Sequence, residues 1–379
     1  MSKKVVIKFG GSSVKDANAF LRCYSIICKN PDTKLVILSA TYNTTNDLEN
    51  LYQRIINKQD FSDVKEKLIE RHRHILNELN LSPDISNSII DKLENYILEC
   101  KTSAQYLPQM MDKFYSIGEL WSSRIFYELL KSKDSSVELL YSPDLIKTDS
   151  LFTMSNVDLE TSRSNAKELK ERMNEEFIFI AQGFIGSDNQ GDITTLGREG
   201  SDYSATILAN ILELDEVQIW TDVEGIANCD PSVVEGSTFF KNLSYDQAEL
   251  MATHGAKVLF SRTLSPIKDL KIPLFVRSTL NPDGKGTLVS DTPYTESDFL
   301  ALTFQKRGSS YIIYLLGQNL ENFSDQIYSL NPIDFTDNKV TFMNEEKLHL
   351  EAQKVFDICL TLDKSSQPQG SRSLNSEPL

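Results

Sequence analysis

The sequence predicts an α/β protein with a mostly parallel sheet, followed by a small α+β region. Over roughly the first 290 residues, short apolar runs alternate with longer amphipathic stretches. The apolar runs are nearly continuous in Val, Ile, Leu and Phe, which is typical of strands buried on both faces. Strands that alternate with helices favour parallel pairing through right-handed crossovers.

The elements follow from these two patterns. The apolar runs predicted as strands are residues 5–10, 34–40, 136–141, 177–184, 216–222 and 272–277. The stretches with helical spacing of apolar residues are 16–29, 64–79, 81–100, 118–131, 166–176 and 203–214. The helical block at 62–131 is longer than one crossover requires, so part of it is expected to form a lid or a dimer surface.

The pattern changes after about residue 297. Three strand-like runs, LALTF, YIIYLL and KVTFM, precede a helical pattern at 345–360, with a short helix between the second and third runs. We therefore expect a main domain over 1–296 and a small α+β domain over 297–363. The polar, Ser- and Pro-rich end, 364–379, is expected to be a disordered tail.

Composition limits the possible partners and compartments. With 379 residues, 40% of them hydrophobic, the chain can bury a large core. A formal net charge of −15 gives no long-range attraction to nucleic acid or to an anionic membrane, so neither is an expected partner. The five cysteines show no C-x-x-C pair, which favours reduced thiols and a cytoplasmic location. The four histidines have no metal-like partner and are expected to be structural or solvated.

Two glycine-containing loops are candidates for anion binding. In KFGGSS, Lys8 ends the first predicted strand, Gly10 and Gly11 follow, and a helix is expected to begin near Ser13, which together suit a phosphate. The segment matches neither a Walker A loop nor G-x-G-x-x-G, and plain turn chemistry is the commoner explanation of a glycine pair. TTLGREGSDYSA, residues 194–205, places an arginine, glycines, a serine and an aspartate before a predicted helix.

Several segments in order carry a specific resemblance. They are KFGGSSV, LSATYNTTN, GEL, QGFIGSDNQGDITTLGREGSDYSA, WTDVEGI and MATHGAKVL. Together they resemble the aspartate kinases of the amino-acid kinase family, from residue 4 to about residue 290. The resemblance implies the amino-acid kinase fold, a three-layer α/β/α sandwich. It also implies transfer of the γ-phosphoryl group of ATP to the side-chain carboxylate of L-aspartate. It also implies Mg²⁺ held mainly through the nucleotide, with no metal site made by protein ligands.

The resemblance assigns roles to residues by position. Lys8 and Lys257 match the family's two phosphate-facing lysines, and Asp202 is expected to orient their ammonium groups. The expected aspartate-binding residues are Arg198 for the α-carboxylate, Glu119 for the α-ammonium, and Thr45, Ser201 and Phe184. The expected nucleotide-binding residues are Lys8, Gly10, Gly11, Ser12, Thr221, Asp222 and Lys257. Taken singly, Lys8 could be a solvated lysine, Glu119 a carboxylate on an exposed helix face, and Asp202 an N-cap for a helix beginning at Tyr203.

The sequence also departs from the family pattern. Glu199 replaces a glycine beside Arg198, where its carboxylate either repels the substrates or points to solvent and restricts the backbone. Ala227 and Ser232 stand where the family has Tyr and Arg, which weakens the expected nucleotide contacts. These departures keep open the alternative of a non-catalytic homologue that binds nucleotide or partners. A kinase for a related amino acid is a second alternative.

The region after residue 297 departs from the family as well. Aspartate kinases usually end in two small regulatory domains of the ACT type, and residues 297–363 supply enough chain for one. We expect a shortened ACT-like domain, used for dimer contacts or to cover the core, with weak or absent inhibition by lysine or threonine. The resemblance implies a homodimer or a higher homo-oligomer.

Overall fold

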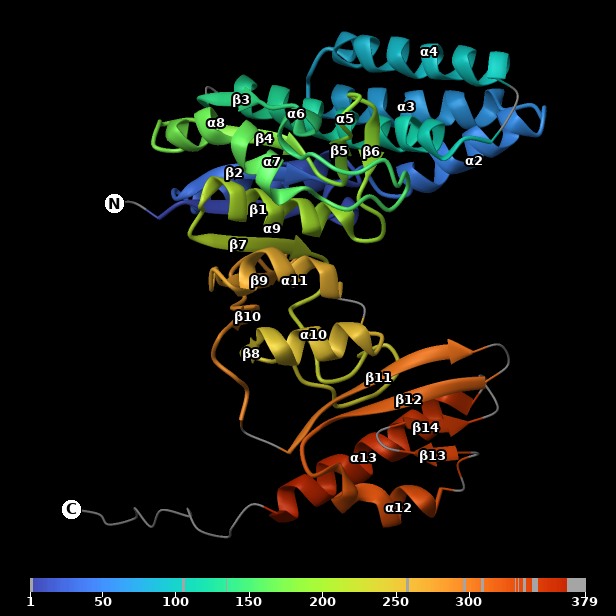
Figure 1. Cartoon of the computed structure of the whole chain (residues 1–379), viewed down its shortest axis with the longest axis vertical. Helices are drawn as coiled ribbons and strands as arrows, with labels where there is room; N and C mark the ends of the chain where they lie inside the picture. Colours follow the sequence, from blue (N-terminus) through green and yellow to red (C-terminus); the bar gives the residue numbers. More distant parts are fainter. Residues whose placement is uncertain are drawn as a thin grey trace.

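The computed structural model describes residues 3–103, 106–133, 135–256, 259–295, 298–307, 310–330, 332, 334–336, 339–342 and 347–366. Its centre is an eight-stranded sheet (Figure 1). The strands, in spatial order, are β3 (Val137–Leu139), β4 (Ile178–Gln182), β2 (Thr33–Leu38), β1 (Val5–Phe9), β7 (Glu216–Thr221), β9 (Leu274–Ser278), β10 (Thr287–Ser290) and β8 (Asn242–Ser244). All neighbours pair in parallel except β9 and β10. The predicted mostly parallel sheet is therefore confirmed.

Helices cover both faces of this sheet, as predicted. Val5, Ile7 and Phe9 of β1 point to one face, where they pack with α1 (Ala17–Lys29) and α5 (Pro108–Ser132). Val6 points to the other face and packs with α9 (Gly200–Leu212). Because side chains alternate along a strand, Lys8 shares the face of Val6 and is directed toward α9.

The helical block between β2 and β3 has a core of its own. Four helices contribute to it: α2 (Thr44–Ile56), α3 (Ser62–Glu78), α4 (Asn87–Ser103) and α5. In Figure 1 α4 lies at the end of the molecule farthest from the C-terminal strands. The sequence did not predict α2. The predicted helix at 81–100 begins instead at Asn87, after a 3₁₀ turn at Pro83–Ser86, and the helix predicted from residue 118 begins at Pro108.

Shorter elements complete the main domain. They are α6 (Ser142–Leu145), α7 (Leu159–Asn165), α8 (Lys167–Arg172), the hairpin β5 (Ile185–Ser187) and β6 (Ile193–Thr195), α10 (Tyr245–Thr253) and α11 (Ser261–Lys268). The helix predicted at 166–176 is wrong in extent: it ends at Arg172, and α7 directly precedes it. The helix predicted from residue 203 begins three residues earlier, at Gly200, so Asp202 lies in its first turn and is not its N-cap.

A second, antiparallel sheet forms the C-terminal region (Figure 1). Its strands, in spatial order, are β11 (Phe299–Arg307), β12 (Ser310–Gly317), β14 (Lys339–Phe342) and β13 (Asp334–Thr336). Along β12, Tyr311, Ile313 and Leu315 pack with α12 (Ser324–Tyr328) and α13 (Leu348–Ser366), whereas the alternate residues join the core of the main domain. Both faces of this small sheet are therefore covered.

The C-terminal helix is longer than predicted. The helical pattern at 345–360 corresponds to α13, which continues to Ser366. It therefore includes the first three residues of the predicted tail, and the remainder, 367–379, lies outside the described residues. Among the helices that the structure describes, none combines the length and the apolar composition needed to cross a membrane.

Candidate active site

Two cavities meet above the C-terminal end of β1. The first, about 680 Å³, is lined by the loop after β2, by α5 and by the loop before α9. The second, about 370 Å³, lies beside the ends of β1 and β7. Four residues line both cavities: Lys8, Gly11, Ser39 and Glu199. The carboxyl ends of parallel strands are the usual place for ligands in open α/β sheets.

Lys8 lies at the boundary between the cavities. Its side chain is almost fully buried and its Nζ forms an ion pair with Asp202 Oδ1, which is buried as well. Asp202 projects from the first turn of α9, on the face of the sheet toward which β1 directs Lys8. The interpretation of Lys8 as a solvated surface lysine is therefore wrong. A buried ammonium that is held by one carboxylate keeps further donors for an anionic ligand.

Glu119 provides a buried carboxylate on the wall of the first cavity. Its Oε1 accepts a hydrogen bond from the Ala40 N–H at 3.1 Å, and its Oε2 is buried without a hydrogen-bond partner among the described residues. Burial raises the pKa of Glu119 to about 8, although the Ala40 N–H and the Lys8 charge oppose this shift. Glu119 is thus not an exposed helix-face carboxylate. An unpartnered buried carboxylate suits a cationic group of a ligand.

The loop before α9 supplies a cation and a helix N-terminus. Arg198 is exposed at the first cavity and forms no ion pair within the described part of the chain. Gly200 and Ser201, in the first turn of α9, also line this cavity. The unpaired N–H groups of a helix N-terminus favour a negative charge. Arg198 and the N-terminus of α9 can therefore bind a carboxylate together.

Several cavity residues have unusual backbone conformations. Asn43, Thr153, Phe184 and Glu199 all line the first cavity and have φ values of 63°, 71°, 68° and 55°. Positive φ is unfavourable for residues with a side chain, especially for β-branched Thr and bulky Phe. Such strain gathers where the surrounding structure must hold a fixed site. Its concentration around one cavity is independent support for a functional site there.

Glu199 is an exposed residue that lines both cavities. Partial desolvation in the cleft and the charge of Asp202 raise its pKa, while Lys8 and Arg198 lower it. The residue also carries the positive φ that a glycine would adopt without strain. The restricted backbone expected from this substitution is therefore present, and the effect of the carboxylate on the substrates stays a prediction.

The second cavity contains the residues expected to bind nucleotide, apart from Lys257. Gly10, Gly11, Ser12, Thr221 and Asp222 line it together with Lys8. The helix expected to begin near Ser13 is instead a 3₁₀ turn at Gly11–Val14, and α1 begins at Ala17. A Cβ atom on Gly11 would lie 2.9 Å from the Ala40 carbonyl oxygen, so only glycine allows this approach. The glycine pair therefore has a packing role in addition to facing the cavity.

The expected aspartate-binding residues all line the first cavity. They are Thr45, Glu119, Phe184, Arg198 and Ser201. Lys257 lies outside the described residues, so its convergence with Lys8 stays a prediction. Ala227 and Ser232 are absent from the described lining of both cavities, and Ser232 instead donates its hydroxyl to Asp230 at 2.6 Å.

Several residues of the first cavity wall were not predicted from the sequence. Ser39, Ala40, Tyr42, Asn43, Asn46, Glu49, Tyr115 and Thr153 also line the first cavity. Tyr115 precedes Glu119 by one helical turn, so helical spacing could have identified it. Thr153 gives no sequence signal. It is held at the site by Asp112, a buried residue of α5 that accepts hydrogen bonds from the N–H groups of Thr153 and Thr195, at 2.9 Å each.

The carboxylates of the site are compatible with a metal ion carried by a nucleotide. Within the described residues, no group of three or more His, Cys, Asp and Glu side chains could hold a metal on its own. Mg²⁺ is usually bound by one or two carboxylates together with substrate phosphates. Asp222 lines the second cavity and can supply such a ligand.

The chain was compared with known proteins. The model of the amino acid kinase family matches residues 3–278. Lysine-sensitive aspartokinase 3 of Escherichia coli (strain K12) is 34% identical over 325 residues, which cover 83% of this chain and 70% of that protein. Aspartokinase 1, chloroplastic, of Arabidopsis thaliana is 30% identical over 311 residues, 80% of this chain and 54% of that protein.

Solved structures agree with these relatives. The crystal structure of E. coli aspartokinase III in complex with aspartate and ADP (R-state) matches with a TM-score of 0.83 and 26% identity, over 94% of this chain and 100% of that chain. The complex of the same enzyme with lysine and aspartate (T-state) gives 0.73 and 30% identity, over 94% and 83%. The chain therefore belongs to the amino acid kinase family, and within it to the aspartokinases.

Proposed function

We propose that this chain is an aspartate kinase that transfers the γ-phosphoryl group of ATP to the side-chain carboxylate of L-aspartate, giving 4-phospho-L-aspartate and ADP. The observation that carries the proposal is the buried Lys8–Asp202 pair at the junction of the two cavities. One cavity has the groups for an amino acid, and the other has the glycines and the lysine for a phosphate chain. The junction is where a carboxylate and a terminal phosphate would meet.

Lys8 would reduce the main electrostatic repulsion between the two substrates of this reaction. The acceptor carboxylate and the γ-phosphoryl group are both anionic, and two unit charges about 4 Å apart repel by about 4 kcal/mol at an effective dielectric constant near 20. A cation that is already in place lowers this repulsion without reorganisation during the reaction. Asp202 holds the Lys8 ammonium, and Lys257 is proposed as the second cation. An ionised carboxylate is itself the nucleophile, so Asp202 need not act as a base.

The first cavity is proposed as the aspartate subsite. Arg198 would bind the α-carboxylate in a bidentate manner, and Glu119 would pair with the α-ammonium. The Thr45 and Ser201 hydroxyls and the backbone at Phe184 would hold the remainder of the substrate. The opposed charges of Arg198 and Glu119 favour an α-amino acid over a simple carboxylic acid.

The second cavity is proposed as the phosphate end of the ATP subsite. Gly10, Gly11 and Ser12 would face the phosphates, and Thr221 and Asp222 the adenosine side. Mg²⁺, bound mainly through the nucleotide phosphates, would neutralise the charge that develops on the transferred group. Asp222 is the residue that would complete its ligands, whereas the Glu199 carboxylate would repel the nucleotide phosphates.

The domain organisation, assembly and location of the protein are proposed as well. We propose that residues 1–296 are the catalytic domain, that 297–363 are an ACT-like domain, and that the chain acts as a homodimer or a higher homo-oligomer. The cysteines are present as thiols, in keeping with the proposed cytoplasmic location.

Trapping of the product separates this function from the alternatives. With ATP, Mg²⁺ and aspartate, an aspartate kinase yields an acyl phosphate that hydroxylamine converts to a hydroxamate. Glu199 at the cavity junction is the observation that favours a non-catalytic homologue, for which no hydroxamate would form with any amino acid. A kinase for a related amino acid would yield hydroxamate with glutamate or another substrate in place of aspartate.

A further inference from the structure

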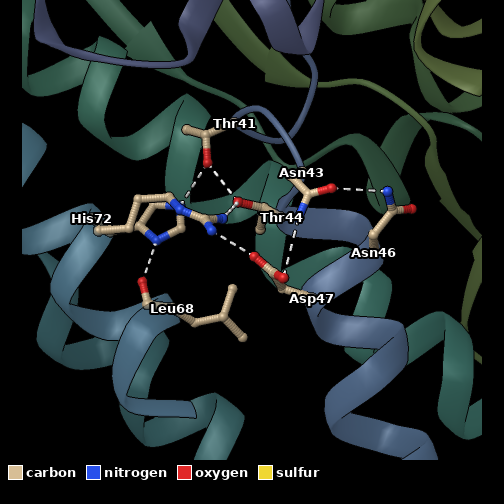
Figure 2. A network of polar contacts seen from close by, with 8 residues as sticks. Thr41, Asn43, Thr44, Asn46, Asp47, Leu68 and His72 are labelled. Carbon is tan, nitrogen blue, oxygen red and sulfur yellow. Dashed lines mark hydrogen bonds and ion pairs between the residues drawn. The ribbon is translucent and has the colours of Figure 1, made fainter. Parts of the chain in front are cut away.

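A buried polar network lies behind the loop that forms one wall of the first cavity (Figure 2). Arg71 and His72 of α3 contact Thr41, Thr44 and Asp47, which lie in this loop and at the start of α2. Arg71 pairs with Asp47 at 2.5 Å and donates to the Thr44 hydroxyl at 3.1 Å. The Thr44 and Thr41 hydroxyls are 2.6 Å apart, and Thr41 Oγ1 is 3.0 Å from His72 Nε2. We call these five residues the α3–loop network.

The hydrogen bonds of this network can be arranged with only one assignment of donors and acceptors. His72 Nδ1 lies 2.7 Å from the Leu68 carbonyl oxygen, which only accepts, so this nitrogen carries the proton. Burial lowers the pKa of His72 to about 4, so the ring is neutral near pH 7 and Nε2 is an acceptor. Thr41 must then donate to Nε2 and accept from Thr44. Thr44 in turn accepts from Arg71, and every hydroxyl hydrogen is assigned.

His72 also contacts α5, the helix that packs beside the loop and carries Glu119. Its ring stacks on Trp121 of α5, with centroids 4.1 Å apart and an angle of 11° between the planes. Trp121 lies two residues after Glu119, whose Oε1 accepts from the Ala40 N–H, next to Thr41. His72 therefore contacts both the loop, through Thr41, and α5, which carries the carboxylate proposed to bind the substrate ammonium.

The network supports a strained residue as well. Asn43, with φ of 63°, donates from its Nδ2 to Asp47 Oδ1 at 3.2 Å, and its Oδ1 accepts from Asn46 at 3.0 Å (Figure 2). Because Arg71 holds Asp47 in place, it also positions the carboxylate that accepts the hydrogen bond from Asn43. Arg71 and His72 themselves do not line the described wall of either cavity.

We propose that Arg71 and His72 are positioning residues for the aspartate subsite, which they serve by holding the loop with Ala40 and Thr45 at a fixed spacing from Glu119. The inference rests on the proposed aspartate kinase function. It predicts that loss of the network weakens aspartate binding more than ATP binding, because the loop lines the first cavity along most of its length and the second only at Ser39.

Two substitutions separate the hydrogen bonds from packing. Arg71→Met removes the donors to Thr44 and Asp47. His72→Phe keeps a ring against Trp121 but removes the acceptor of the Thr41 hydroxyl. Each should raise KM for aspartate about tenfold, the usual effect of losing one hydrogen bond, while kcat and KM for ATP change less than about twofold.

Arg54→Met is a matched control. Arg54 of α2 donates to Asp63 of α3 at 2.6 Å, so this ion pair joins the same two helices but lies at their exposed ends. It should leave KM for aspartate unchanged. In a double-mutant cycle, His72→Phe should add little to the effect of Thr41→Val, because both remove the same hydrogen bond.

The outcomes distinguish this inference from the proposed function. A wild-type chain that forms no hydroxamate with aspartate would overturn the proposed function and the inference with it. An active wild type whose aspartate KM is as insensitive to Arg71→Met and His72→Phe as to Arg54→Met would overturn the inference alone. If Arg71→Met does not fold, as judged by circular dichroism, Arg71→Lys serves the same test, since lysine can reach Asp47 but lacks the fork that also binds Thr44.

Discussion

The Lys8 ammonium and the Asp202 carboxylate form a buried ion pair where the two cavities meet. The two residues are far apart in the chain, one at the end of the central strand and the other in the first turn of α9. Their contact joins the two halves of the proposed site. Removal of either partner would leave an uncompensated buried charge.

Lys8→Ala should lower kcat about 100-fold or more and leave aspartate binding measurable, because it removes a cation placed for the transition state. Steady-state kinetics with ATP and aspartate, together with calorimetry of aspartate binding, measure the two effects. Lys29→Ala removes an exposed ion pair with Asp283 and serves as the control. Normal turnover of the Lys8 variant would contradict the proposed mechanism.

Glu119 should make aspartate binding dependent on pH. In the empty cavity its pKa is about 8, so the carboxyl is largely protonated near pH 7. The ammonium of a bound substrate favours the ionised form and lowers this pKa, so binding releases a proton. Aspartate affinity should therefore rise with pH from about 6 to about 8, by up to about tenfold per pH unit, and then level off.

Calorimetry in two buffers of different ionisation enthalpy measures this proton release. Glu119→Gln, which keeps an oxygen to accept from the Ala40 N–H, should bind aspartate weakly and release no proton. Glu49→Gln changes another carboxylate of the same cavity and should release protons as the wild type does. Equal proton release by wild type and Glu119→Gln would exclude Glu119 as the source.

Glu199→Gly should change both stability and nucleotide binding. Glycine tolerates the φ of 55° at this position, so the free energy of unfolding should rise by about 1 kcal/mol. The change also removes a carboxylate from the junction of the cavities, so KM for ATP should fall. Denaturant unfolding and steady-state kinetics measure these two effects.

The other end of the same helix offers the control. Glu213, at the C-cap of α9, has φ of 52°. Glu213→Gly should give a similar stabilisation with unchanged KM for ATP. If KM for ATP rises in Glu199→Gly, the carboxylate contributes to binding of the metal–nucleotide complex and the proposed repulsion is wrong.

The sheet could be predicted from the sequence because its strands give local apolar patterns, and the cavity-lining residues could be predicted because their segments together resemble one family. The buried strands are continuous apolar runs, and Arg198 and Ser201 lie in one short loop. Some misses were avoidable. Leu48, Leu51, Tyr52 and Ile55 have helical spacing and form the buried face of α2, and Pro108 marks the start of α5 in the manner usual for proline at a first helical position.

Other features had no local signal. The strain at Thr153 is imposed by its hydrogen bond to Asp112, which lies 41 residues away, and the α3–loop network depends on how α3 packs against α2. His72 was predicted to be structural or solvated, and it is buried. Its contacts with Thr41 and Trp121 follow only from the tertiary structure.

The small C-terminal sheet predicts weak regulation by amino acids. One face packs with α12 and α13, and the other packs on the main domain, where the Thr303 hydroxyl donates to the His254 carbonyl oxygen at 2.6 Å. A sheet with both faces covered is suited to protecting the core. Lysine and threonine, titrated separately at subsaturating aspartate, should therefore inhibit the kinase little below about 1 mM. E. coli lysine-sensitive aspartokinase 3, assayed in parallel, is the control for the assay. Half-maximal inhibition of this chain at sub-millimolar lysine or threonine would show that the region binds an effector, and Thr303→Val would then test whether the contact at His254 transmits it.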